Sequence, residues 1–207
     1  MEILSKNEFL TRCGAAFRKI FEGFFPSNDH IFSTLLVERF ILFRYDYELT
    51  NPLLEDMIYT AQKVGDTGFY IAVLTGPDYE SRLTPLYWFL EFSDIDKYVG
   101  LVGPLEHVIF SPSSQWGIKF SFDGYALLGC TEEFAIILRE RFPGIDTQVY
   151  DFLNYWKESE KLNYIRTTWI PPLLTHIYGE NRCRELMKKI GSDFNQTGNE
   201  SENHINC

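Results

Sequence analysis

The sequence predicts a single α+β domain with a mixed, mainly antiparallel sheet and helices packed on it. Two observations carry this prediction. Residues 106–142 are expected to form three strands joined by short connections and then a helix, an order that implies antiparallel pairing. The chain is also 45% hydrophobic and 16% aromatic, enough for one sizeable core. Because no Gly-, Ser- or Pro-rich linker divides the middle, we expect one domain over residues 1–190 and a disordered polar tail over 191–207.

The N-terminal segment predicts a helix. Ser5 and Glu8 have the spacing of a capping box, in which each side chain bonds the other residue's backbone N–H. Apolar residues at helical spacing follow and predict an amphipathic helix that ends near Gly23. Within 37–49, aromatic residues alternate with charged ones, which is typical of a strand.

The next segment alternates between helical and strand patterns. A helix is expected over 53–64, where Pro52 suits its start, and strands are expected over 69–74 and 86–92. Strand, helix and strand over 37–74 indicate a crossover unit beside the later strands.

Residues 106–142 hold the clearest local signals. Residues 115–122 alternate apolar with polar side chains, as a strand with one buried face requires. Asp123 and Gly124 predict a two-residue hairpin turn, because both tolerate the positive φ of a primed turn. Thr131 is expected to cap a helix whose first turn carries two glutamates, which offset the positive end of the helix dipole.

The last third of the domain is expected to be helical. A helix is predicted over 147–158, a break at residues 169–172, which include Pro171 and Pro172, and a short basic helix over 180–190.

Charge is distributed unevenly along the chain. The formal net charge is −10, and residues 46–96 carry a local balance of −8, whereas residues 161–190 carry +4. An acidic surface repels nucleic acid and membrane phosphate and attracts basic partners, although it can also serve solubility alone. We therefore expect a protein partner, basic in character, and neither nucleic acid nor membrane; the sequence does not define the oligomeric state.

The sequence predicts a cytoplasmic protein. The apolar runs are interrupted by charge, as at Glu38 and Arg39, whereas a membrane span needs roughly 20 apolar residues. We expect no signal peptide, and the four cysteines lie far apart, which favours free thiols in a reducing compartment. The four histidines have no neighbours at zinc-ligand spacing, so neither a metal nor another cofactor is expected.

A binding surface is predicted in the acidic segment. Tyr79 lies between Asp78 and Glu80 in a polar loop, and Asp94 and Asp96 follow the next predicted strand. Exposed aromatic side chains dominate binding hot spots, and carboxylates beside them attract a basic partner.

Cys130 and His107 are the alternative, catalytic, candidates. Cys130 directly precedes a predicted helix, whose free amides and dipole lower a thiol pKa, and His107 lies in the same group of strands as a potential base. The competing interpretation is a buried thiol and a histidine bonded to backbone, because Cys/His pairs without a family motif arise by chance.

Residues 115–118, Gln-Trp-Gly-Ile, together with 129–134, Gly-Cys-Thr-Glu-Glu-Phe, resemble small bacterial immunity-type, toxin-neutralising proteins. In that family a Trp-Gly strand and a strand ending in glycine precede a helix with Phe near its start. This chain has Gly129-Cys130 where the family more often has Gly-Gly. The resemblance implies a non-catalytic protein that masks a toxin, frequently a basic nuclease, through an acidic face.

The sequence thus leads to three functional hypotheses. The first is a non-catalytic cytoplasmic protein-binding domain, such as an immunity protein that occludes a basic toxin. The second is a cysteine-dependent enzyme that uses Cys130 and His107. The third is a structural or accessory protein with an unknown partner.

Overall fold

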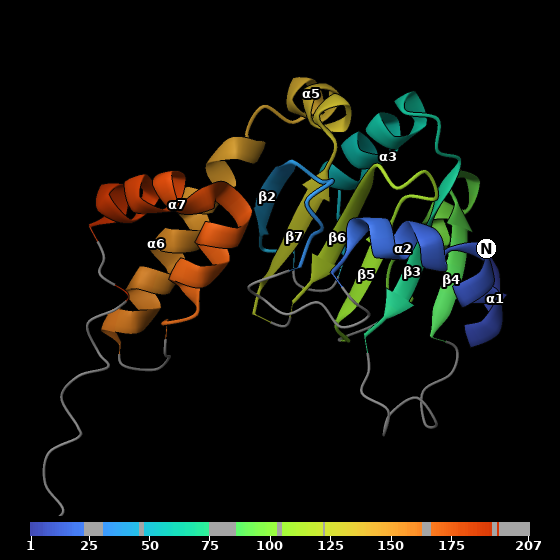
Figure 1. Cartoon of the computed structure of the whole chain (residues 1–207), viewed down its shortest axis with the longest axis horizontal. Helices are drawn as coiled ribbons and strands as arrows, with labels where there is room; N and C mark the ends of the chain where they lie inside the picture. The colour runs from blue at the N-terminus through green and yellow to red at the C-terminus, as the bar shows by residue number, and fades with distance from the viewer. Residues whose placement is uncertain are drawn as a thin grey trace, which may run out of the picture.

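One antiparallel sheet forms the centre of the molecule (Figure 1). The computed structural model describes residues 1–22, 31–45, 48–74, 86–102, 105–121, 123–162, 167–191 and 194. Seven described strands lie in the order β1-β4-β3-β5-β6-β7-β2, and every neighbouring pair is antiparallel. The strands are β1 (Glu2–Leu4), β2 (Glu38–Phe43), β3 (Gly68–Val73), β4 (Tyr87–Glu91), β5 (His107–Phe110), β6 (Trp116–Phe120) and β7 (Tyr125–Cys130). The predicted α+β class is confirmed.

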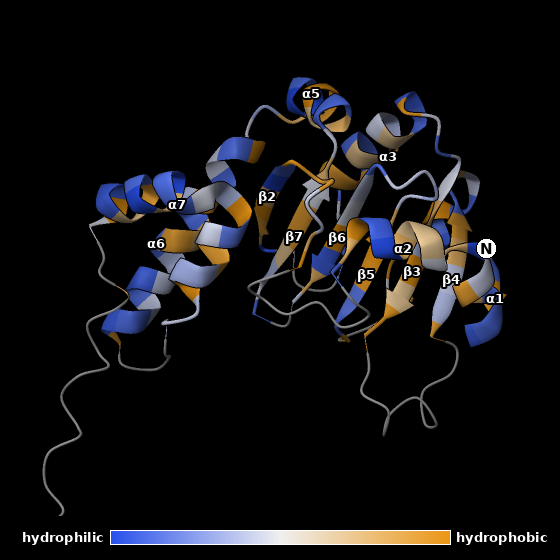
Figure 2. Ribbon diagram, viewed as in Figure 1, coloured by the Kyte–Doolittle hydropathy of each residue, from blue (hydrophilic) through white to orange (hydrophobic). Residues whose placement is uncertain are grey.

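Helices cover both faces of this sheet and flank its β2 edge. They are α1 (Lys6–Arg12), α2 (Gly14–Ile20), α3 (Leu53–Lys63), α5 (Glu132–Arg141), α6 (Gln148–Lys161) and α7 (Ile170–Ile190), with the 3-10 turns η1 (Phe92–Lys97) and η2 (Ile145–Thr147). On one face Trp116 contacts Phe134 of α5, with ring centroids 5.8 Å apart. On the other face Phe110 contacts the ring of Phe17 in α2, at 5.5 Å. Hydrophobic residues accordingly concentrate on the strands and on the helix faces turned toward them (Figure 2).

Strand β6 is buried on both faces, whereas its sequence pattern predicted one buried face. Lys119 and Ser121, which alternate with the aromatic residues, are both buried. Two glycines of β6 and β7 allow the covering segments to approach. A Cβ on Gly117 would lie 2.5 Å from Ile20, and one on Gly129 would lie 2.6 Å from the Phe32 ring. The absence of a side chain at these positions is therefore required by packing.

The predicted hairpin between β6 and β7 is present, but its turn differs from the predicted one. Ser121 N–H donates to Tyr125 O at 3.1 Å, so the connection spans three residues rather than two. Gly124 has a φ of 77°, in the left-handed region. Three-residue hairpins of this kind place a glycine in the left-handed region at the last position, which restores the strand twist.

The N-terminal helix is shorter than predicted. The Ser5–Glu8 capping box is present, but the helix breaks at Cys13 and a second one, α2, ends at Ile20. The break lets rings from both helices reach the same residue of the sheet, because Phe9 of α1 lies 6.1 Å from Phe110 and Phe17 of α2 lies 5.5 Å from it.

The basic helix predicted over 180–190 is confirmed as the second part of α7, and α7 also has a helical part before it. It begins at Ile170 with two prolines in its first turn, where the missing N–H groups would be unpaired in any case. Gly179, with a φ of 76°, interrupts it. Phe194, in the segment predicted as a disordered tail, is fully buried; residues 192–193 and 195–207 lie outside the described residues.

The strand–helix–strand unit over residues 37–74 also differs from the predicted crossover. Strand β2 lies at an edge of the sheet and pairs with β7, whereas β3 lies between β4 and β5. Helix α3 therefore connects two strands that are not neighbours. This placement leaves β2 as an edge strand beside α6 and α7.

Candidate functional site

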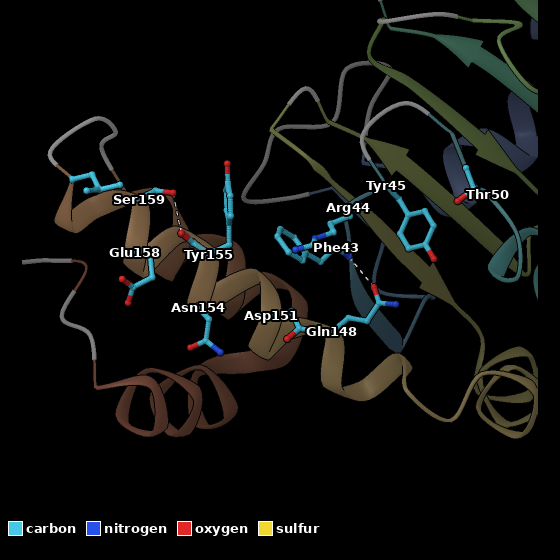
Figure 3. Close-up of a pocket in the computed structure, with 11 residues that line it drawn as sticks. Phe43, Arg44, Tyr45, Thr50, Gln148, Asp151, Asn154, Tyr155, Glu158 and Ser159 are labelled. Atoms are coloured by element: carbon cyan, nitrogen blue, oxygen red, sulfur yellow. Dashed lines mark hydrogen bonds between the residues drawn. The ribbon is translucent and has the colours of Figure 1, made fainter.

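A cleft of about 880 Å³ opens between the end of β2 and helix α6 (Figure 3). We call it the edge cleft, because β2 is an edge strand of the sheet. In Figure 1, α6 and α7 stand beside β2, outside the sheet. The edge cleft is lined by Phe43, Arg44, Tyr45, Thr50, Gln148, Asp151, Asn154, Tyr155, Glu158, Ser159 and Leu162.

Polar side chains of α6 and α7 hold the outer side of β2. Phe43 N–H donates to Gln148 Oε1 at 2.8 Å, and Ile41 N–H donates to Tyr178 Oη at 3.2 Å. Arg39 Nη1 adds a hydrogen bond to His176 O at 2.6 Å. An exposed edge strand presents unpaired N–H groups, and these contacts satisfy two of them. They also fix the position of α6 relative to the strand, which sets the two walls of the edge cleft.

Helix α6 has one stripe of side chains in the core and another in the edge cleft. The core stripe consists of Val149, Phe152, Leu153 and Trp156. The cleft stripe consists of Gln148, Asp151, Tyr155, Ser159 and Leu162, three or four residues apart, as one helix face requires. Tyr155 is 50% exposed and Leu162 is 65% exposed. Two large side chains with apolar surface are thus left in contact with solvent on a concave surface.

The opposite wall comes from the end of β2 and the residues after it. The ring of Phe43 lies 5.4 Å from that of Tyr155, so aromatic groups of both walls meet. The guanidinium of Arg44 lies 5.6 Å from the centroid of the Phe43 ring. Burial raises the pKa of Tyr45 above its usual value, so its hydroxyl remains protonated at neutral pH.

The edge cleft contains two carboxylates and one cationic side chain. Glu158 is hydrogen-bonded to Lys161 Nζ at 2.6 Å, and this bond lowers the pKa of Glu158. Asp151 is exposed and has no hydrogen-bond or ion-pair partner among the residues that the structure describes. Arg44 supplies the positive charge. Such a surface can stack on planar groups and bind cations, but its lining residues form no nucleophile–base pair.

No group of three or more His, Cys, Asp and Glu side chains in the described part of the chain is arranged to hold a metal ion. The edge cleft itself offers carboxylate and amide oxygens from one helix, with Asp151 and Glu158 two turns apart. The arrangement therefore suits an organic or protein ligand better than a metal.

The predicted binding residues do not lie in the edge cleft. Asp78, Tyr79 and Glu80 are outside the described residues. Asp94 and Asp96 are in η1, which follows β4 near the opposite edge of the sheet. Asp94 accepts hydrogen bonds from Lys97 and from the N-terminal amino group, which lower its pKa to about 2.

The structure corrects the catalytic alternative. Cys130 is opposite Trp116 at the start of β6, whereas His107 is opposite Phe120 at its end. Four residues of strand separate these positions by about 13 Å, too far for proton transfer. Burial raises the pKa of Cys130 well above its usual value and lowers that of His107 to about 4. His107 Nδ1 lies 2.8 Å from Leu105 O, which matches the competing interpretation of a histidine bonded to backbone.

The acidic and basic segments do not neutralise each other among the described residues. Arg182 of the basic segment pairs locally with Glu185, at 3.0 Å. In the acidic segment, Asp56 pairs with Arg141 of α5, also at 3.0 Å. Part of the acidic segment is thus internally paired, but with other cations.

No family model, no curated protein and no solved structure matches this chain. Within the described part, no helix has the length and apolar character needed to cross a membrane.

Sequence reasoning missed the edge cleft because its walls are about a hundred positions apart in the chain. Phe43 and Tyr155 carry no joint signal in one sequence. One local signal was available: the polar side of the predicted helix 147–158 contains Tyr155, an aromatic residue outside the apolar stripe. An aromatic residue on a solvent-facing stripe indicates a contact surface.

Proposed function

We propose that this protein is a non-catalytic binding domain that recognises a partner protein at the edge cleft. The observation that carries the proposal is the exposed ring of Tyr155 in an open cleft that the Asp151 carboxylate, one helical turn away, also lines. Rigid aromatic side chains supply binding energy at low entropic cost, and neighbouring carboxylates select the charge of the partner.

The proposed partner is a basic protein, and the proposed biological role is that of a bacterial immunity protein that occludes a toxin. The net charge of −10 supports a basic partner, because the field of the whole chain attracts it and accelerates association. The proposal also places the protein in the cytoplasm. Cys13, Cys130 and Cys183 are buried free thiols, which is compatible with a reducing compartment.

The test is an affinity capture from a lysate of the native host at low and at high salt. The bait is the full chain, compared with an Asp151→Lys/Tyr155→Ala variant and with Asp96→Lys as a matched charge change outside the cleft. We expect a basic protein to be retained at low salt by the wild type and by Asp96→Lys, and to be lost from the cleft variant. Retention that is equal on all three baits would contradict the proposed site, and the absence of any retained protein would contradict the proposed function.

A further inference from the structure

We propose that the edge cleft takes an arginine side chain of the partner protein, stacked on the ring of Tyr155 and paired with the carboxylate of Asp151. This inference rests on the proposed function, since it names the group of the partner that the edge cleft recognises. Three features of the described residues carry it.

The first feature is that the edge cleft already holds a guanidinium of its own. Arg44 lines the cleft, and its guanidinium lies 5.6 Å from the centre of the Phe43 ring. Figure 3 shows Arg44 and Phe43 together, facing the wall that carries Tyr155. A planar, weakly hydrated cation is the group that stacks best on an aromatic ring. The contact inside the chain therefore indicates the chemistry that this wall accepts.

The second feature is the spacing of Asp151 and Tyr155 on α6. Residues four apart lie on the same face of a helix, with Cβ atoms about 5–6 Å apart. A guanidinium stacked on the Tyr155 ring is then within reach of the carboxylate, and the planar fork of arginine can donate two parallel N–H bonds to it. A lysine ammonium cannot stack and pair in this way.

The third feature is that both groups are accessible. Tyr155 is 50% exposed, and Asp151 is exposed with no ion-pair partner among the described residues. Glu158, the second carboxylate of the edge cleft, is occupied by Lys161. Of the two carboxylates that line the edge cleft, only that of Asp151 has no ion-pair partner among the described residues. It is therefore available to a cation of the partner protein.

The experiment uses the full chain and N-acetyl-arginine amide as the probe, titrated by two-dimensional NMR. The neutral isostere N-acetyl-citrulline amide and N-acetyl-lysine amide serve as comparison probes. We expect saturable shifts at residues of the edge cleft with the arginine probe, weaker binding of the lysine probe, and none of the citrulline probe. Equal shifts with citrulline, or shifts confined to other surfaces, would overturn the inference.

Four variants locate the contact. Asp151→Asn and Tyr155→Leu are each expected to weaken binding of the arginine probe about two- to fivefold, the range for an exposed ion pair or cation–π contact. Asp96→Asn removes the same charge near the edge of the sheet opposite β2, and is expected to leave the affinity for the arginine probe unchanged. Arg44→Gln removes a positive charge from the edge cleft that repels the arginine probe, so it should tighten binding of the probe about twofold or more. Unchanged affinity in both Asp151→Asn and Tyr155→Leu would overturn the inference.

The two proposals fail in distinguishable ways. If a partner is captured through Tyr155 but the arginine probe does not bind, the arginine inference is wrong and the binding function stands. If the arginine probe binds in the edge cleft but no captured protein depends on that cleft, the proposed function is wrong.

Discussion

The middle of the sheet and the β2 edge are held together by different kinds of interaction. Strands β3, β5, β6 and β7 are buried along their whole length, and helices or connecting segments cover both faces. At the β2 edge, individual hydrogen bonds from Gln148 and Tyr178 replace a neighbouring strand. Apolar burial is large and continuous in the middle, whereas the edge depends on a few directed contacts.

This difference explains where a binding site can form. Close packing around the central strands leaves no surface for a partner, because both faces are already occupied. At the edge, α6 contacts β2 through Gln148 and Phe152, and the rest of the space between α6 and β2 is open toward solvent. The site lies where two elements meet incompletely, and the rigid sheet holds one of its walls.

The largest loss of stability is expected from Phe110→Ala in the middle of the sheet. Phe110 is fully buried and contacts the rings of Phe9, Phe17 and Phe21. Its truncation should lower the free energy of unfolding by about 3–5 kcal/mol, measured by denaturant titration, through lost burial and the cavity that remains. Phe43→Ala, at the half-buried wall of the edge cleft, is the matched variant and should cost clearly less. Equal costs would break the distinction between the two regions.

The second effect is a dependence of stability on pH that originates in His107. Its ring is fully buried, and its Nε2 has no hydrogen-bond partner among the described residues. Burial lowers the pKa of His107 to about 4, below the value of about 6.5 expected for the unfolded chain. Between these values the unfolded state binds more protons, so stability is complete above about pH 6.5 and falls as the pH decreases toward 4.

The expected loss over this range is about 3 kcal/mol, and it should be absent from a His107→Leu variant. Denaturant unfolding at several pH values measures it for both proteins. Because the other titrating groups remain in the variant, the difference between the two pH profiles isolates the histidine. Parallel profiles would show that His107 is accessible to protons in the folded state.

A third, smaller effect is expected from Tyr178→Phe at the β2 edge. The variant leaves the N–H of Ile41 without its hydroxyl acceptor and should lower the free energy of unfolding by about 1–2 kcal/mol. Amide hydrogen exchange at Ile41 should accelerate with little change at the central strands, which shows that the loss is local to the edge. Tyr59→Phe, an exposed tyrosine on α3, is the control and should alter stability by less than about 0.5 kcal/mol. Uniform acceleration across the sheet would mean that edge and centre unfold together.

A feature could be predicted from the sequence where it depends on neighbouring residues, and could not where it depends on contacts between distant parts of the chain. The strands within 106–130 and the cap of α5 were predictable, because strand patterns and a threonine before two glutamates act over a few residues. Strand β1 (Glu2–Leu4) was not predicted, and β2 ends at Phe43, where the alternation over 43–49 begins. Thr131 does accept a hydrogen bond from Phe134 N–H, at 3.4 Å. The break at Cys13 was not predictable in this way, because it depends on how the rings of two helices meet Phe110.

The edge cleft depends on strand order, which a single sequence does not contain. The sequence places Phe43 on a strand and Tyr155 on a helix, but not that strand at the edge beside that helix. Asp94 and Asp96 were predicted to belong to a binding surface because they are close in sequence, but residues that are close in sequence do not always converge on one surface. Asp94 is occupied by the N-terminal amino group and Lys97.

The smallest effect on stability is expected from the pair Asp96→Asn and Asp151→Asn, and this pair separates charge from position most sharply. Both aspartates are exposed, so each change should alter the free energy of unfolding by less than about 1 kcal/mol. Each also changes the net charge by the same amount, so a general attraction of basic partners would respond equally to both. A cleft-specific contact responds only to Asp151, with a faster dissociation rate of the captured partner in surface plasmon resonance, because short-range contacts act mainly on dissociation. Equal loss in both variants would show that the acidic surface acts through its overall field and that the edge cleft has no special part in recognition.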